Sequence, residues 1–169
     1  MRRPLLAAVL LALAGSAGAA TFFETTVEEM ARTSDAVVRG RVAAAASRFT
    51  RDGRIVTEVE IDVAGAWKGR APVALRLVVP GGSVGGIAQS VDAAPRFEEG
   101  EEVVVFVTRR GAAWLVNGYA LGKYRVEGAD ARSALGGAKV LPRALPAGER
   151  AVGTMAVAEL EARVRAAAR

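Results

Sequence analysis

The chain has 169 residues, of which 51% are hydrophobic, and it carries a formal net charge of +5 with no cysteine and no histidine. The two missing residue types exclude disulfides, thiol nucleophiles, Ser-His-Asp catalysis and histidine-ligated metals, and we expect neither a metal site nor a cofactor. The positive charge comes almost entirely from scattered arginines, because lysine occurs only at Lys68, Lys123 and Lys139. Since no basic stripe is formed, we expect no nucleic-acid partner.

Residues 1–20 have the pattern of an export signal. Two arginines stand near the start, an uncharged apolar stretch covers 5–13, and small residues at 17–19 favour cleavage near Ala19 or Ala20. A retained membrane anchor is the alternative, but the apolar stretch is short for a membrane span. We therefore predict a secreted or periplasmic protein with no stable membrane anchor after cleavage of the signal.

Residues 21–35 are predicted to form a lead-in that contains a short helix. Thr26 and Glu29 have the spacing of a capping box, which satisfies backbone N–H groups at the start of a helix. One apolar side of this helix would be formed by Val27, Met30 and Ala31. We expect the helix to close one end of the core.

An alternation of apolar and polar residues from Ala36 onward predicts antiparallel strands. The pattern is clearest over Ile55–Val63, where apolar residues share one face and the other face carries Glu58, Glu60 and Asp62. We expect these carboxylates, and those at 98–102, to be solvated. The stretch Val103–Val107 is continuously apolar, which predicts a central strand buried on both faces. Further strands are predicted at 36–42, 73–79, 114–116 and 119–126.

Turn signals divide these strands. Asp52-Gly53 and Asn117-Gly118 predict two hairpins, and residues 81–100 predict a long glycine-containing connection. Because five or six strands follow one another with short turns and no helices between them, the sequence predicts a mainly β fold. Its centre would be a small antiparallel OB-like β-barrel over residues 36–126, with a short N-terminal helix and a C-terminal helix.

The C-terminal part has a different composition. Residues 127–153 are rich in glycine, alanine, proline and arginine without any period, which predicts a flexible tether. Residues 154–168 then predict a helix. Its apolar face consists of Val157, Leu160 and Val164, and its i,i+4 ion pairs are Glu159–Arg163 and Glu161–Arg165. We expect the apolar face to dock on the chain's own barrel; docking on a partner is the alternative.

The order of features resembles a known module. The sequence reads SDAVV at 34–38, WKG at 67–69, PGG at 80–82 and GEEVVVF at 100–106. Over about residues 34–126 this progression resembles the netrin-like OB-fold barrel of the tissue inhibitors of metalloproteinases, and more closely resembles uncharacterised exported bacterial domains. Those inhibitors place an N-terminal cysteine on the protease zinc. This chain has no cysteine, so the resemblance implies the barrel but not that mechanism, and only inhibition through loops stays open.

Ser83 lies in a segment, Gly81–Gly85, that matches the G-x-S-x-G nucleophile elbow. That motif needs a strand-to-helix turn and a histidine partner, and the sequence offers neither. The catalytic alternative that stays open is a hydrolase in which Ser83 is the nucleophile and Lys68 or Lys123 is the base. The structural interpretation is that these glycines permit positive φ angles in a wide loop.

Binding is the function that these observations favour. OB-type barrels bind ligands on a strand face and in neighbouring loops, and exposed aromatic side chains there suit a sugar or a peptide. The residues expected to bind are Gly81, Gly82, Ser83, Arg96, Phe97, Trp114, Tyr119 and Tyr124. We predict an exported, non-catalytic binding module that engages another extracytoplasmic protein or an envelope glycan through the 81–97 loop and a barrel face. The alternatives are the Ser83 hydrolase and a structural or assembly protein that docks through its C-terminal helix.

Overall fold

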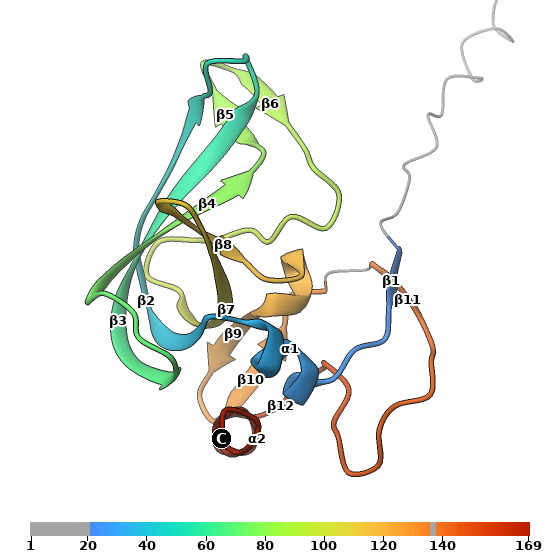
Figure 1. Cartoon of the computed structure of the whole chain (residues 1–169). Helices are drawn as coiled ribbons and strands as arrows, with labels where there is room; N and C mark the ends of the chain where they lie inside the picture. Colours follow the sequence, from blue (N-terminus) through green and yellow to red (C-terminus); the bar gives the residue numbers. More distant parts are fainter. Residues whose placement is uncertain (1–20, 136–137) are drawn as a thin grey trace, which may run out of the picture.

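The computed structural model describes residues 21–135 and 138–169, so the predicted export signal at 1–20 lies outside the described residues. Within the described part of the chain, both α-helices are too short to cross a membrane. The expected fold class is confirmed: the chain is mainly β, with two helices packed beside a ring of strands (Figure 1).

The ring consists of five strands. In spatial order they are β2 (Ala36–Phe49), β3 (Ile55–Lys68), β4 (Ala74–Pro80), β8 (Ala113–Val116) and β7 (Glu102–Arg110), and β7 pairs again with β2. Every pairing in the ring is antiparallel except that of β4 with β8, which is parallel. A closed ring leaves fewer strand edges open to other chains than an open sheet does.

The long hairpin of β2 and β3 forms one side of the molecule (Figure 1). Its turn is the predicted Asp52-Gly53, with Gly53 at a φ of +78°. Bulges interrupt the ladder near Gly40, and an added Cβ at Gly40 would lie 2.3 Å from the carbonyl oxygen of Asp62. Because bulges bend a strand, they let this hairpin curve around the ring interior.

Two apolar cores lie on opposite faces of β2 and β7. Inside the ring, Val38 packs with alternate residues of the other strands, namely Val59, Ile61, Leu75, Leu77, Val79, Val103, Val105 and Val107. Outside the ring, Val37, Val104 and Phe106 pack against the helices. The prediction that Val103–Val107 is buried on both faces is therefore confirmed.

Both helices belong to the outer core. Helix α1 (Val27–Thr33) begins at Thr26, whose hydroxyl accepts a hydrogen bond from the backbone N–H of Glu29 at 3.0 Å, as the capping spacing predicts. Helix α2 (Val157–Ala167) packs against α1. It buries Val157, Leu160 and Val164, and both predicted i,i+4 ion pairs form. The apolar face of α2 is thus occupied within the chain.

The region after β8 corrects two predictions. Tyr119–Gly122 is a 3-10 turn, η1, so the predicted strand at 119–126 is reduced to β9 (Lys123–Glu127). Asn117-Gly118 does not turn a hairpin, because β8 and β9 both pair with β7 and the N–H of Asn117 donates to Phe106 O at 2.8 Å. The Asn117-Gly118 pair correctly indicates a bend of the chain. It does not show that the strands on either side of the bend both pair with β7 and not with each other.

The predicted tether at 127–153 also needs correction, because parts of it are strands. β10 (Asp130–Ser133) pairs with β9, and β12 (Met155–Ala156) pairs with β10. β11 (Lys139–Leu141) pairs in parallel with β1 (Thr21–Phe23) at one side of the molecule (Figure 1). The segment before α2 lies alongside the start of α1, where the N–H of Val27 donates to the carbonyl of Arg150 at 2.9 Å and Thr26 forms a β-bridge with Ala151.

The connection 81–100 contains a short hairpin of its own, formed by β5 (Gly82–Val84) and β6 (Ile87–Gln89). The positive φ angles expected for its glycines are present: they are +91° at Gly81 and +135° at Gly82.

The docked position of α2 can be tested through Leu160, whose side chain is fully buried. The change Leu160→Ala is expected to lower the free energy of unfolding by about 2 to 5 kcal/mol, because it leaves a cavity in the outer core. Urea-induced unfolding measures this loss. The matched control is Val73→Ala at a side chain that is 83% exposed, which should change stability by less than about 0.5 kcal/mol. Equal stabilities for both variants would contradict the docked arrangement.

Candidate functional site

Residues 90–97, which we call the covering segment, lie against the ring interior. Pro95 is buried, and Ala94 and Phe97 pack against the inner core. The segment is held from the other side by η1, since the N–H of Ala120 donates to the carbonyl of Ala93 at 3.0 Å. Ala93 has a φ of +59°, a conformation that costs energy for any residue but glycine. Packing on both sides therefore fixes this irregular segment in place.

A cavity of about 410 Å³, which we call the loop groove, lies between the β2–β3 hairpin and the connection 81–97. Its floor is apolar and includes Val59, Val79 and Phe97, which belong to the inner core or pack on it. Its walls carry small polar side chains, Ser47, Thr57, Ser83, Gln89 and Ser90. An apolar hollow with a few polar groups at its rim is the usual form of a ligand site.

Hydrogen bonds fix one wall of the loop groove to the hairpin. The hydroxyls of Ser47 and Thr57 lie 2.9 Å apart, and Thr57 donates to the carbonyl of Gly81 at 2.8 Å. The N–H of Ser83 donates to Ser47 Oγ at 3.3 Å. Gly82 runs so close to this pair that an added Cβ would lie 2.2 Å from Ser47 Oγ. Glycine is required here both by the positive φ and by the close approach.

Five of the eight residues predicted to bind meet in the loop groove, namely Gly81, Gly82, Ser83, Arg96 and Phe97. The other three lie elsewhere. Trp114 packs on the inner core, with the Arg109 guanidinium 5.9 Å from its ring, and Tyr119 is exposed on η1. Tyr124 is fully buried beside Phe106, where burial raises the pKa of its hydroxyl. The structure therefore corrects the prediction for Tyr124, which has no surface to offer a ligand.

Ser83 and the two candidate lysines are not arranged as a catalytic pair. Ser83 lies on an exposed strand, not at a strand-to-helix turn. Lys68 Nζ donates to the carbonyls of Ala31 and Ser34, at 2.7 and 2.8 Å, and so satisfies the end of α1. Lys123 is bound in a separate ion cluster. Among the described hydrogen bonds, none joins Ser83 Oγ to a lysine amine.

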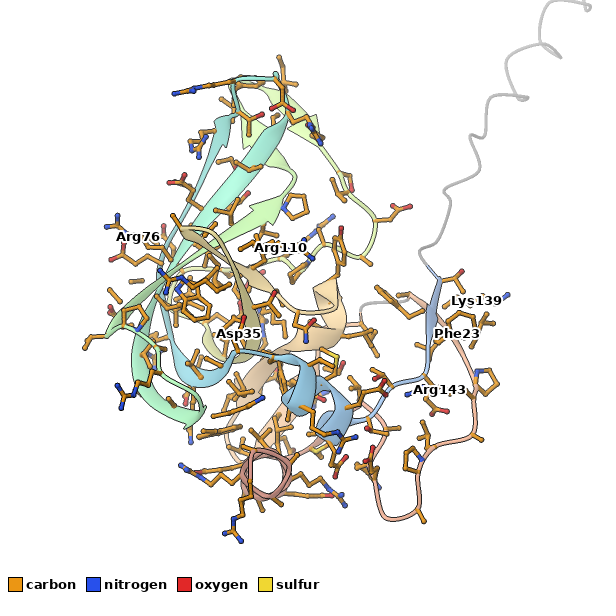
Figure 2. The ribbon with its side chains drawn as sticks, in the orientation of Figure 1. Phe23, Asp35, Arg76, Arg110, Lys139 and Arg143 are labelled. Carbon is orange, nitrogen blue, oxygen red and sulfur yellow. The ribbon has the colours of Figure 1, made fainter. Side chains whose placement is uncertain are left out.

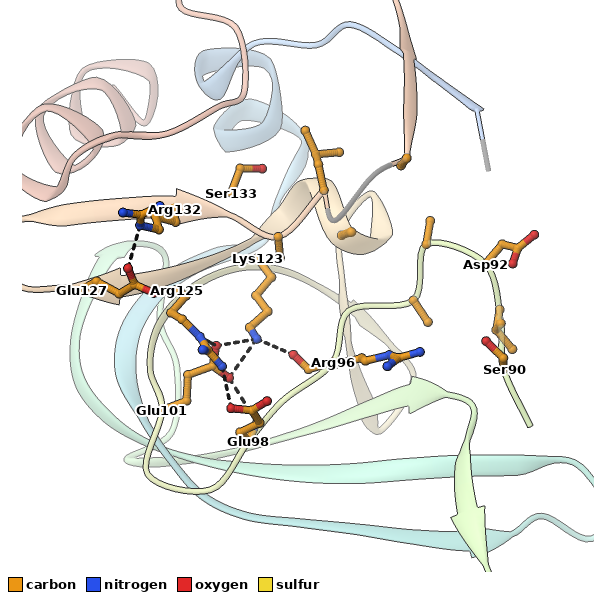
Figure 3. A pocket seen from close by; sticks show the side chains of 17 residues that line it. Ser90, Asp92, Arg96, Glu98, Glu101, Lys123, Arg125, Glu127, Arg132 and Ser133 are labelled. Atoms are coloured by element: carbon orange, nitrogen blue, oxygen red, sulfur yellow. Dashed lines mark hydrogen bonds and ion pairs between the residues drawn. The ribbon is translucent and has the colours of Figure 1, made fainter. Parts of the chain in front are cut away.

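That cluster, the Lys123 cluster, contains Lys123, Glu101, Arg125 and Glu98. Lys123 Nζ lies 2.7 and 2.8 Å from the two oxygens of Glu101, and both side chains are almost fully buried. Arg125 bridges Glu101 and Glu98, at 2.7 Å each. The cluster forms one wall of a second open pocket, of about 660 Å³, seen in Figure 3. Sequence reasoning missed it, because Glu101 was assigned to a solvated turn and its partner lies in a different strand.

The electrostatics of Glu101 follow from its neighbours. Burial opposes its ionisation, but the hydrogen bonds from Lys123 and Arg125 outweigh this and hold the pKa of Glu101 below its ordinary value. A buried ammonium is tolerated only when its hydrogen-bonding capacity is filled, and Lys123 also donates to the carbonyl of Arg96. The same ammonium lies 4.5 Å from the centre of the Phe97 ring. The Lys123 cluster therefore anchors Arg96 and Phe97, which line the loop groove.

Arg96 differs from the other cations nearby. Arg125 and Arg132 each pair with a carboxylate, as Lys123 does. The guanidinium of Arg96 has no hydrogen bond or ion pair among the described residues, and it is the one charged side chain that lines the described loop groove. Figure 3 shows it extending away from the Lys123 cluster. The part of the chain that the structure describes contains no group of three or more carboxylates placed to hold a metal ion.

Comparison of the chain with protein families, curated proteins and solved structures found no match.

The buried ion pair can be tested by removing one charge. Lys123→Met leaves Glu101 buried with only Arg125 as a cationic partner, and is expected to cost about 3 kcal/mol of unfolding free energy. The double change Glu101→Leu with Lys123→Met removes both buried charges and should recover part of that loss. Urea-induced unfolding of the two variants checks this. A double variant less stable than Lys123→Met alone would contradict the account.

The lowered pKa of Glu101 predicts a pH dependence. Because the unfolded carboxyl protonates at higher pH than the folded one, the stabilisation is present above the ordinary pKa of 4.5 and is lost as pH falls through the lowered pKa of the folded Glu101. Glu101→Gln should therefore be less stable than the natural chain near neutral pH, and the difference should shrink at about pH 3. The matched control, Glu58→Gln, removes an exposed carboxylate paired with Arg48 and should cost less than about 1 kcal/mol. A pH-independent difference for Glu101→Gln would contradict the assignment.

Proposed function

We propose that this protein is an exported, non-catalytic binding module whose loop groove holds a segment of another extracytoplasmic protein. The observation that carries the proposal is the convergence of Gly81–Ser83 and Arg96–Phe97 on one groove. These residues come from the two ends of the connection 81–97, which the sequence also predicts to bind a ligand. The export signal that the sequence predicts at 1–20 is the reason for proposing a location outside the cytoplasm.

The loop groove suits a peptide better than a glycan. Sugars are commonly bound on an exposed aromatic face, and Phe97 is the one aromatic residue that lines the described groove. The Phe97 ring packs on the inner core and is also approached by Lys123 Nζ. A peptide instead needs an apolar floor for a side chain and polar groups for its backbone, and Val79, Ser83 and Gln89 supply these.

Arg96 adds a preference for an acidic partner. Its guanidinium is a fork of hydrogen-bond donors that matches a carboxylate, and no described carboxylate lines the groove to compete for it. The rival functions receive less support. A Ser83 hydrolase needs a lysine base within hydrogen-bond reach, but both candidate lysines bind other groups. An assembly role for α2 needs its apolar face, which is buried within the chain.

Photo-crosslinking tests the proposal. A photoreactive residue placed at Ser83 in the producing cells should give one discrete protein adduct, whereas the same residue at Ala162, exposed on α2, should not. Arg96→Gln should weaken formation of the adduct, because a hydrogen bond to a charged group contributes about 1.5 to 3 kcal/mol. Arg51→Gln, an exposed arginine at the hairpin tip, is the matched control.

Two outcomes would contradict the proposal. The first is no adduct at Ser83, or the same adduct from Ala162. The second is an adduct that is removed by glycosidases and not by proteases, which would favour the envelope glycan instead.

A further inference from the structure

The ring is closed at its weakest point by a single residue pair. β4 and β8 run parallel, and the register joins them only at Leu77 and Trp114. The other junctions of the ring are longer ladders; β2 and β7, for example, pair over six residues, Ala36–Arg41 with Glu102–Val107. After the Leu77–Trp114 pair, β4 continues through Val78–Pro80 and β8 through Leu115–Val116 with no described pairing between them.

A cavity of about 530 Å³, which we call the seam pocket, opens where these two strands separate. Its sides are the unpaired ends themselves, Val78–Pro80 and Leu115–Val116, and Pro95 of the covering segment also lines it. Side chains that point away from the inner core contribute an apolar outer wall, since Val56, Val78 and Leu115 alternate with inward residues of their strands.

The rim of the seam pocket carries one charge and one aromatic side chain. Arg110 is the only charged residue that lines the described pocket, and its guanidinium has no hydrogen bond or ion pair among the described residues. It lies at the end of β7 and is labelled in Figure 2. Tyr119 is 49% exposed and has a φ of +56°, a strained conformation for a bulky residue. Such strain concentrates at ligand-binding positions.

We propose that the seam pocket binds one extended peptide segment of a partner protein, with an aliphatic side chain between Val78 and Leu115 and a carboxylate on Arg110. The gap lies between two strands, so an extended chain fits it better than a globular ligand does, as in peptide recognition by strand addition. The single unpaired cation and the absence of any described lining carboxylate select an acidic segment. The seam pocket adjoins the loop groove, with which it shares Val79, Pro80 and Pro95, but its cation is Arg110 and not Arg96. The proposal does not depend on the function of the loop groove.

The test uses a random peptide library displayed on phage and selected on the purified full chain, after removal of phage that bind Leu115→Arg. Enriched peptides should combine an aliphatic residue with a neighbouring carboxylate. A synthetic peptide from the selection should bind Arg110→Gln roughly tenfold more weakly than the natural chain. The matched control Arg51→Gln should leave its affinity unchanged. Arg96→Gln should also leave it unchanged, because Arg96 does not line the seam pocket.

If Leu115→Arg fails to fold, Tyr119→Gly provides a second variant that still tests the proposal. Glycine accepts the positive φ at this position, so the fold should be retained while the rim side chain is lost. Binding of the selected peptide should then weaken, with thermal unfolding unchanged or slightly raised in temperature. Failure to enrich any peptide, enrichment of peptides without a carboxylate, or unchanged binding to Arg110→Gln would overturn the proposal.

Discussion

The burial of β2 and β7 on both faces is the constraint on which the rest of this structure depends. A chain without cysteine gains nothing from disulfides, so packing alone must offset the loss of chain entropy. Alternate residues of the same strands serve two cores: Val38 and Val105 face the ring interior, while Val37 and Phe106 face the helices. A shift of either strand by one residue would exchange the two sets. The double burial therefore fixes the register of the ring and the position of both helices together.

The Lys123 cluster makes a different kind of contribution. A buried ion pair seldom stabilises a fold more than an apolar pair of the same size, because both charges must be removed from water. The contribution of the ion pair here is to hold neighbouring segments in position. Lys123 binds Glu101 and the carbonyl of Arg96 and lies against the Phe97 ring, so one ammonium fixes the end of the covering segment. The shape of the loop groove depends on that segment, and thus on a charge outside the groove.

The sequence predicted features that depend on a few neighbouring residues. The cap at Thr26, the turn at Asp52-Gly53 and the two-sided strand at Val103–Val107 are all local patterns, and each is confirmed. The strands at 130–133 and 139–141 were missed, because three or four residues are too few to show a period. They form through pairing with distant partners, which composition does not reveal.

In the candidate site, too, the residues that follow a local pattern could be predicted and those brought together by distant strands could not. The loop groove was predicted in part, since its glycines and Arg96–Phe97 lie at the ends of one connection. Tyr124 was wrongly placed at the surface, although a signal was present: Tyr124 and Val126 alternate with Lys123 and Arg125, which indicates that the tyrosine faces a core. The Lys123–Glu101 pair had no such signal, because only the register of β9 on β7 brings the two strands together.

The loop groove and the seam pocket share one cause, which is the irregular closure of the ring. A ring in which every strand pairs along its length exposes little of its interior, but here β4 and β8 meet at a single residue pair and the covering segment must fill the remaining opening. That segment contains Pro95, which has no N–H to leave unpaired, and Ala93 in a left-handed conformation. It packs against the inner core without joining the sheet, so hollows remain on either side of it. Arg96 and Arg110 are the single charges at two of these hollows, and neither has a described partner within the chain. The same incomplete closure that exposes apolar surface thus also leaves a cation without a described partner beside it, and both proposals of peptide binding depend on this combination.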